Sequence, residues 1–155
     1  MVKTGTGLQH MAQALAQAEA AGDRGEVPVG AVIVEAATGI VLAAAGNRTE
    51  ELADPTAHAE VLAIRAACAE RGEPRLPDCD LYVTLEPCGM CAAAISFARL
   101  RRVYFGAYDV KGGGVEHGPR FFHQATCHHA PEIYGGLEER RAAELLKEFF
   151  RRRRL

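Results

Sequence analysis

The sequence predicts an α/β fold, a three-layer α/β/α sandwich around a mixed sheet of about five strands. Two observations support this prediction: short β-branched or apolar runs recur along the chain, and segments with helical periodicity separate them. A third is composition, since 48% hydrophobic and 25% charged residues in a chain of 155 are ordinary values for a globular protein. We therefore expect residues 1–155 to form a single domain.

The first part of the chain predicts a helix followed by a β-hairpin. Apolar residues at three- and four-residue steps outline one helical face: Leu8, Met11, Ala12, Leu15 and Ala18. Gly22 can end this helix. The β-branched run 27–34 and the apolar run 40–45 flank a turn at Thr38-Gly39, which is typical of two strands joined as a hairpin.

A second helix is predicted to begin at Asp54-Pro55, with Asp54 as the N-cap and Pro55 in the first turn. Its apolar residues continue at helical density to about Arg71. His58 and Glu60 would then lie in the first turns of this helix.

A Pro-containing loop at 73–80 leads into the apolar run 81–85, which is typical of a buried strand. Pro87 can open the next helix, which we expect to reach about Ala98. Cys88 and Cys91 fall at the start of this helix.

The rest of the chain predicts a strand at 103–107 and a final helix from Leu137. Five apolar residues mark one face of that helix: Ala142, Leu145, Leu146, Phe149 and Phe150. The intervening segment 111–136 is rich in Gly and Pro, so we expect irregular structure with short elements there.

Charge and cysteine content restrict the class of protein. The formal net charge is only −2, but the run Arg151–Arg154 makes the end of the chain basic, which favours a polyanionic partner. Five cysteines are an odd number and no secretory leader is visible, so we expect no disulfide framework and a cytoplasmic location. No apolar run approaches the ~20 residues that a membrane-spanning helix needs.

Two cysteines three residues apart, Cys88 and Cys91, share a face at a helix start, where free N–H groups favour thiolates. Such a pair alone fits a redox dithiol, half of a structural zinc site, or coincidence. The sequence has only one such pair, whereas structural zinc sites need a second pair of ligands. With His58 as third ligand, zinc would keep an open position for water, whose pKa it can bring to ~7.

Glu60 is the candidate for moving protons at such a site. In an ideal helix His58 and Glu60 would point ~200° apart, so they can share a pocket only if it wraps the start of the helix. In that case Glu60 could accept a proton from water and deliver it to the substrate's ring nitrogen and leaving amine.

The motif His58-Ala59-Glu60, followed by Pro87-Cys88-Gly89-Met90-Cys91, resembles the signature of zinc-dependent nucleobase deaminases. Three longer segments are similar to the bacterial tRNA adenosine deaminases of the cytidine/deoxycytidylate deaminase superfamily: DPTAHAE from Asp54, LYVTLEPCGMC from Leu81 and RRVYFGAYD from Arg101. The resemblance covers most of the chain. It implies hydrolytic conversion of adenosine to inosine at the wobble position of a tRNA anticodon.

The resemblance also implies roles for individual residues. One Zn²⁺ per subunit would be held by His58, Cys88 and Cys91, with Glu60 as the proton shuttle. The substrate would be contacted by Asn47, by the Ala59 backbone, and by Asp109 at the neighbouring nucleotide. RNA would also contact the end of the last helix, at Phe149, Phe150, Arg151 and Arg153. The expected partners are a tRNA anticodon stem-loop and a second copy of the chain, as a homodimer.

Alternatives remain open for several residues. Asn47 follows a glycine at a strand end and is typical of a turn, and Asp109 can cap a loop. Phe149 and Phe150 fit the core by periodicity, and we expect one to face inward and one to face RNA. We interpret the run Cys127-His128-His129 as loop and packing residues rather than a second metal site, and Cys68 and Cys79 as unreactive.

Three other functions fit part of the pattern. A deaminase of a free base or nucleoside, such as guanine or cytosine, would have the same zinc centre but would need no basic aromatic end. A zinc-stabilised nucleic-acid-binding module without chemistry would not need the open metal position or Glu60. A dithiol redox protein would use only the two cysteines.

Overall fold

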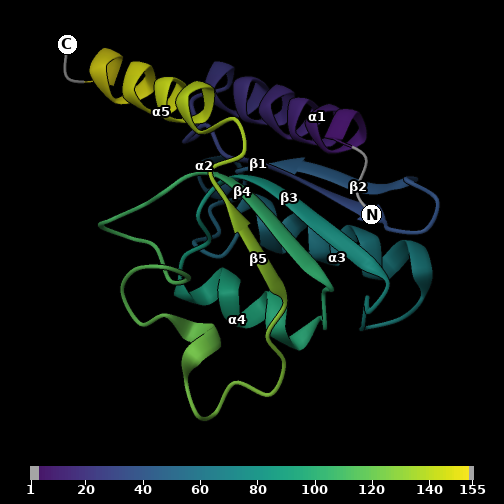
Figure 1. Ribbon diagram of the computed structural model, residues 1–155. Coiled ribbons are helices and arrows are strands. Elements are labelled where there is room, and N and C mark those ends of the chain that lie inside the picture. Colours follow the sequence, from purple (N-terminus) through teal and green to yellow (C-terminus); the bar gives the residue numbers. More distant parts are fainter. Residues whose placement is uncertain (1–3, 154–155) are drawn as a thin grey trace.

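The computed structural model describes residues 4–153 and has the three layers that the sequence predicts (Figure 1). The strands are β1 (Gly30–Glu35), β2 (Val41–Gly46), β3 (Cys79–Leu85), β4 (Arg102–Ala107) and β5 (Glu132–Gly135). The helices are α1 (Thr4–Asp23), α2 (Thr49–Leu52), α3 (Ala59–Arg71), α4 (Gly89–Phe97) and α5 (Glu139–Arg153), with a 3₁₀ turn, η1, at Phe121–His123.

The five strands form one mixed sheet in the order β2-β1-β3-β4-β5. Strand β1 is antiparallel to β2 and β3, whereas β3, β4 and β5 run parallel. Helices α1 and α5 cover one face and α3 and α4 the other (Figure 1). The predicted fold class is therefore confirmed.

Side chains of the central strands alternate between two cores, as the two-residue period of a strand requires. In β1, Ile33 packs with residues of α3 and α4, whereas Val32 packs with Met11 and Leu15 of α1. Both sides of β1 are buried, which explains why its sequence reads as a continuous β-branched run.

The buried face of α1 differs from the predicted one. Leu8 is 41% exposed and Ala12 is also exposed, whereas Met11, Ala14, Leu15 and Ala18 are fully buried. Because α1 is rich in alanine, two of its faces are similarly apolar. One of these faces lies against the sheet, where the helix approaches the strands closely. A Cβ at Gly30 would lie 2.0 Å from the carbonyl oxygen of Ala14, so α1 packs directly on the backbone of β1.

The predicted start of the second helix is wrong by four residues. The side chain of Asp54 does not cap a helix but closes a local turn, accepting hydrogen bonds from the Thr56 N–H (2.8 Å) and hydroxyl (2.7 Å). Helix α3 begins at Ala59, and His58 is its N-cap with extended backbone angles (φ −75°, ψ 151°). The short helix α2, which the sequence analysis did not predict, precedes this turn.

The other boundaries lie within three residues of prediction, with one omission. The first strand begins at Gly30 rather than at 27, and β3 begins at Cys79, inside the expected loop 73–80. Strand β5 is one of the short elements expected within the otherwise irregular segment 111–136, but the sequence analysis did not place it. It has four residues and is mostly exposed, so it carries neither the length nor the apolar alternation that marks a strand.

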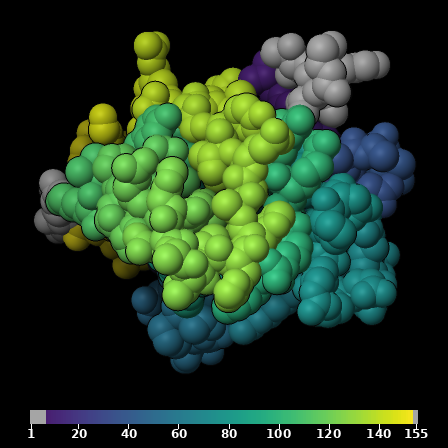
Figure 2. Space-filling view, turned by 60° about the horizontal axis from the view of Figure 1, so that its bottom comes forward, coloured from purple at the N-terminus to yellow at the C-terminus, as the bar shows by residue number. Residues whose placement is uncertain are grey.

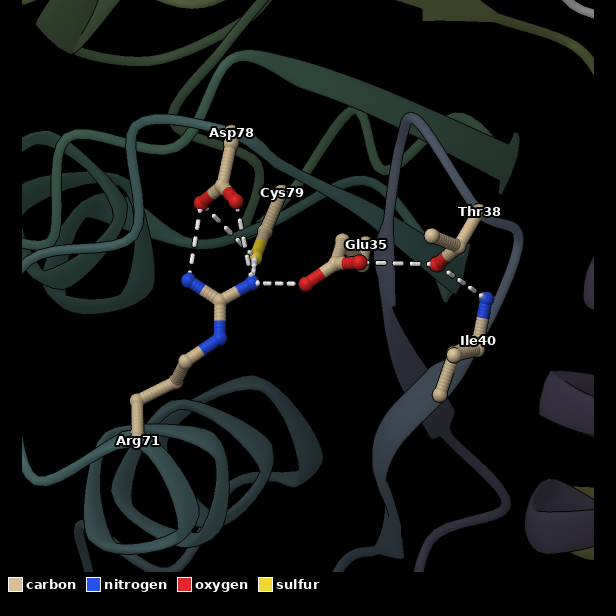
Figure 3. Close-up of polar contacts among 6 residues, drawn as sticks. All are labelled: Glu35, Thr38, Ile40, Arg71, Asp78 and Cys79. Carbon is tan, nitrogen blue, oxygen red and sulfur yellow. Dashed lines mark hydrogen bonds and ion pairs between the residues drawn. The ribbon is translucent and has the colours of Figure 1, made fainter.

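At one end of the sheet, Arg71 ties α3 to two strands (Figure 3). Its guanidinium forms two hydrogen bonds of 3.0 Å with the Asp78 carboxylate and one of 2.6 Å with Glu35. Because Arg71 is the last residue of α3, this cluster fixes the end of the helix opposite His58. In residues 4–153, no helix combines the length and apolarity required to cross a membrane.

Candidate metal centre

The three predicted metal ligands converge at the starts of two helices. His58 is the N-cap of α3, Cys88 is the N-cap of α4, and Cys91 lies in the first turn of α4. The Nδ1 atom of His58 lies 3.6 Å from Cys88 Sγ and 3.5 Å from Cys91 Sγ. All three ligand atoms lie within 4.8 Å of one another.

This geometry fits zinc. Bonds of ~2.3 Å to sulfur and ~2.0–2.1 Å to nitrogen at tetrahedral angles place N and S about 3.6 Å apart. The two distances from His58 match that tetrahedral edge. One imidazole and two thiolates are also the nitrogen and sulfur donors that zinc prefers, and three ligands leave a fourth position for water.

The thiol pair favours an anionic site. The Cys91 thiol and His58 hydrogen-bond to the Cys88 sulfur, which lowers the pKa of Cys88 to about 4. The same interaction raises the pKa of Cys91, because its proton is shared with the Cys88 thiolate. Unpaired N–H groups at the start of α4 favour negative charge in the same place. A soft cation would replace this shared proton.

Glu60, the second residue of α3, is only 4% exposed. Burial raises its pKa to about 7, a value that suits a group that both accepts and donates protons. The extended backbone of His58 removes the ~200° separation that both residues would have inside one helix. The Glu60 carboxylate faces Cys91 and lies near His58 and Cys88, which is the arrangement that a proton-carrying role for Glu60 requires.

Asn47 links the end of β2 to the start of α3. Its side-chain oxygen accepts a hydrogen bond of 2.8 Å from the Ala59 N–H, and its amide donates one of 3.1 Å to the Val27 carbonyl. Arg24 donates a hydrogen bond of 3.1 Å to the Asn47 carbonyl, a contact that the sequence analysis did not anticipate. The Ala59 N–H is thus already used within the fold, whereas Asn47 retains a second amide hydrogen.

Asp109 caps a loop, which is the alternative interpretation that the sequence left open. Its Oδ1 accepts hydrogen bonds from the N–H groups of Lys111 (3.2 Å) and Gly112 (2.9 Å). The side chain is half-buried and follows the end of β4. A loop cap does not prevent it from contacting a nucleotide, so that role stays a prediction.

Glu86 is a site residue that sequence reasoning missed. It follows the end of β3, directly before Pro87 and Cys88, and its side chain is fully buried. Although burial raises the pKa of Glu86, hydrogen bonds from the backbone of Asp109 and from His117 lower it below its ordinary value. An acidic residue between a buried strand and a proline is the signal that could have identified it.

The predicted RNA-contacting residues lie at the end of α5. Phe149 is half-buried and Phe150 is 45% exposed, and their rings meet edge to face at 5.3 Å. Phe150 is thus the more exposed of the two rings, and the predicted contact of one ring with RNA stays a prediction. Arg151 is exposed and pairs with Glu148, and the guanidinium of Arg153 lies 4.6 Å from the Phe149 ring centre.

A groove of about 450 Å³ runs between the C-terminal ends of α1 and α5. Phe149 and Arg153 both line it, and Arg153 also donates a hydrogen bond to the Gly25 carbonyl across the groove. The groove contains acidic as well as basic residues, including Asp23 and Glu148. Arg154, the end of the basic run, lies outside the described residues.

The run Cys127-His128-His129 lies in a loop, where Cys127 and His129 are half-buried and His128 is exposed. The Cys127 thiol donates to the His129 carbonyl, and the His129 ring hydrogen-bonds the Leu100 carbonyl at 2.7 Å. Burial raises the pKa of Cys68, and raises that of Cys79 to about 12, which disfavours their reactive thiolates. Within residues 4–153, only one group of three or more His, Cys, Asp or Glu residues is placed to hold a metal ion, namely His58, Cys88 and Cys91.

Comparisons with known proteins agree with this chemistry. Residues 6–107 match the family described as the cytidine and deoxycytidylate deaminase zinc-binding region. A tRNA-specific adenosine deaminase of Agrobacterium fabrum is 62% identical over 145 residues, which cover 94% of each chain. One of Bacillus subtilis is 40% identical over 142 residues, covering 92% of this chain and 87% of the relative.

Solved structures resemble the fold. One from a study of A-to-I editing by tRNA:A34 deaminases at the wobble position has a TM-score of 0.87 and 62% identity, covering 89% of this chain and 99% of the other. A guanine deaminase from Nitrosomonas europaea has a TM-score of 0.80 at 23% identity, covering 92% and 83%. The second similarity is one of fold alone.

Proposed function

Because this chain belongs to the family of tRNA-specific adenosine deaminases, within the zinc-binding cytidine and deoxycytidylate deaminases, we propose that it converts adenosine to inosine at the wobble position of a tRNA anticodon. The observation that carries the proposal is the buried carboxylate of Glu60 beside three convergent metal ligands. A site that only stabilised the fold would need neither an open metal position nor this carboxylate.

His58, Cys88 and Cys91 would hold one zinc ion per subunit. When bound, zinc lowers the pKa of a water molecule toward neutrality and so supplies a nucleophile at physiological pH. The two cysteines would bind as thiolates, and the helix start at α4 favours their negative charge.

Glu60 would carry the protons of the reaction. It takes one from the attacking water and delivers it to the ring nitrogen, and a later transfer to the amine lets the C6–N6 bond break and ammonia leave. Its pKa of about 7 allows proton transfer in both directions near neutral pH. Its burial keeps bulk water from competing for the proton.

The base and its neighbours would be held by groups around the metal centre. The free amide hydrogen of Asn47 is available to a purine, the Ala59 backbone would line the base pocket, and Asp109 would meet the adjacent nucleotide. At the end of α5, the exposed ring of Phe150 can stack on an unpaired base, and Arg151 and Arg153 can approach the phosphates. Anticodon-loop bases are already unpaired, which lowers the cost of moving one into a pocket.

The competing function is deamination of a free base or nucleoside. Its zinc chemistry is the same, so only the choice of substrate distinguishes the two functions. Purified, zinc-loaded protein would be incubated with an anticodon stem-loop carrying adenosine at the wobble position, and separately with adenosine, guanine and cytidine. We expect inosine only at the wobble position of the stem-loop. Turnover of a free base with the stem-loop untouched would contradict the tRNA assignment and leave the deaminase assignment standing.

Glu60→Gln separates an enzyme from a binding module. The amide keeps the size of the side chain but cannot accept a proton, so zinc content should stay at one per chain while turnover falls by at least about a thousandfold. A binding module would bind the stem-loop and turn over nothing in either form.

We also propose that the chain works as a cytoplasmic homodimer. Helix α4 turns an apolar face outward, in which Phe97 is 73% and Met90 37% exposed. Phe97 and Met90 lie seven residues apart and so share one side of the helix. Sedimentation of the wild type should give a dimer mass, and Phe97→Glu should give a monomer. The cytoplasm is where tRNA and reduced thiols occur together.

A further inference from the structure

The Glu86 carboxylate accepts five hydrogen bonds from one segment of the chain, residues 109–117. Its Oε1 atom accepts from the Asp109 N–H (3.0 Å) and from His117 Nδ1 (2.8 Å). Its Oε2 atom accepts from the N–H groups of Val115 (3.2 Å), Glu116 (2.8 Å) and His117 (3.2 Å). Because this carboxylate is fully buried and accepts so many hydrogen bonds, it holds the backbone of the segment in place.

The segment packs closely on the start of α4, where Cys88 lies. The Gly114 N–H donates a hydrogen bond of 2.8 Å to the Pro87 carbonyl. A Cβ at Gly113 would lie 2.4 Å from Glu86 Oε2, so only glycine allows this approach. Figure 2 shows the segment between β4 and β5, in green, as a compact mass on the surface. It is therefore an ordered layer whose position depends on Glu86.

Glu86 thereby joins two parts of the proposed site. Along the chain it is two residues from Cys88, and across space it holds the backbone of Asp109, the predicted contact to the adjacent nucleotide. The Glu86 N–H donates to the Ala107 carbonyl at 2.8 Å, so the ends of β3 and β4 are also fixed to each other here. The Glu86 side chain therefore adds to the pairing of β3 and β4 in fixing the position of Asp109 relative to Cys88.

We propose that Glu86 is a positioning residue for RNA recognition, which holds Asp109 at a fixed place relative to the metal centre. This inference rests on the proposed function, because it concerns how the substrate of that site is bound. Glu86 does not touch the reacting atoms. It acts through Asp109, so its removal should weaken substrate binding more than it slows the chemical step.

Glu86→Gln tests this with little change in shape. The remaining oxygen can face the three N–H donors of residues 115–117, and the new amide can donate to His117 once that ring presents an acceptor nitrogen. The amide cannot accept from Asp109, so that contact is lost selectively. We expect KM for the stem-loop to rise about three- to tenfold, the value of one hydrogen bond, with kcat within about twofold.

His117→Ala is the matched control, because it removes one of the five hydrogen bonds and leaves the one from Asp109. It should keep the wild-type KM. In a double-mutant cycle, Glu86→Gln should add little to Asp109→Ala, because Glu86 acts on RNA binding only through the Asp109 side chain, which Asp109→Ala removes. Additive effects, or an unchanged KM in Glu86→Gln that retains zinc and its thermal midpoint, would overturn the proposal.

Two further measurements keep the test decisive. If Glu86→Gln fails to fold, Glu86→Asp keeps the charge but shortens the side chain that reaches the Asp109 N–H, and it should raise KM to a similar extent. Hydrogen exchange tests the geometry without RNA: the amide of Asp109 should exchange at least about tenfold faster in Glu86→Gln, whereas the amides of 115–117, which keep an acceptor oxygen, should change less. If the wild type leaves the stem-loop unmodified, the proposed function fails, whereas unchanged exchange in a folded Glu86→Gln overturns the role of Glu86.

Discussion

The side-chain oxygen of Asn47 accepts a hydrogen bond of 2.8 Å from the main-chain N–H of Ala59, the first residue of α3. This contact caps the helix from a residue twelve positions earlier in the chain. It fixes the start of α3, from which the His58 ring faces the two cysteines and the Glu60 carboxylate faces Cys91. Asn47, which the family resemblance predicts to contact the substrate, is therefore also part of the scaffold of the site.

Replacing Asn47 should therefore affect stability as well as activity. Asn47→Ala leaves the buried Ala59 N–H without its acceptor, so the free energy of unfolding should fall by about 1–3 kcal/mol. Asn47→Asp keeps an acceptor at the helix start and should cost less stability. Urea unfolding of both variants, with zinc content measured alongside, checks this. Equal stability of Asn47→Ala and the wild type would show that the contact is not a cap.

The metal assignment predicts a sharp difference between two cysteines. Cys88→Ser removes a ligand that meets His58 and Cys91, so bound zinc should fall well below one per chain and turnover should be lost. Cys127→Ser changes a half-buried thiol that bonds the His129 carbonyl, and it should keep one zinc per chain. Atomic absorption on both purified variants is the measurement. Zinc loss in Cys127→Ser would indicate that Cys127 belongs to a second metal site.

Glu26 should make stability depend on pH below about 4.5. It is 2% exposed and accepts hydrogen bonds from the N–H groups of Glu50 (3.1 Å) and Glu51 (2.9 Å) at the start of α2. Burial raises its pKa, but these hydrogen bonds lower it below the ordinary value of 4.5. The stabilisation is therefore complete above 4.5 and is lost as the pH falls through the lower folded-state pKa.

The variant Glu26→Gln isolates this contribution. At pH 7 it should lower the free energy of unfolding by about 1–3 kcal/mol, because the amide replaces an ionised acceptor of two buried N–H groups. At pH 3 the two proteins should differ less, since a protonated Glu26 resembles the amide. Unfolding in urea at pH 7, 5 and 3 measures both values. A difference that stays constant with pH would contradict the assignment.

The Arg71 cluster should contribute stability without affecting the metal centre. Its guanidinium pairs with Asp78 in a two-bond arrangement and reaches Glu35, and it is mostly shielded from solvent (Figure 3). Arg71→Ala should lower the thermal midpoint with zinc content unchanged, because it removes all of these hydrogen bonds at once. Arg65 is the control, because it is 61% exposed and lies 4.0 Å from Asp54, so Arg65→Ala should cost less than about 0.5 kcal/mol. Thermal unfolding that ranks the two variants equally would contradict this difference.

Most regular elements could be predicted because their signal lies within a short window of sequence. The β-branched run of β1, the apolar strand β3 and the periodic face of α5 each carry their own pattern. The misses have a common cause. In the described part of the chain, strand β5 pairs only with its neighbour β4, and Asn47 caps the start of α3. Neither feature could therefore be predicted from the residues of the element itself. The buried stripe of α1 likewise depended on the glycine that it meets in β1.

By itself, the sequence indicated the chemistry of the centre: His58, Glu60, Cys88 and Cys91, together with the resemblance of their motif to nucleobase deaminases, predicted zinc and a proton carrier. Only the tertiary structure decided how these residues meet. The first two lie at the start of α3 and the other two at the start of α4, and contacts between distant segments bring these starts together. The same holds for Glu86, whose five donors come from residues 23 to 31 positions later. Donor chemistry belongs to the residue type, whereas position depends on packing and hydrogen bonds that no local window contains.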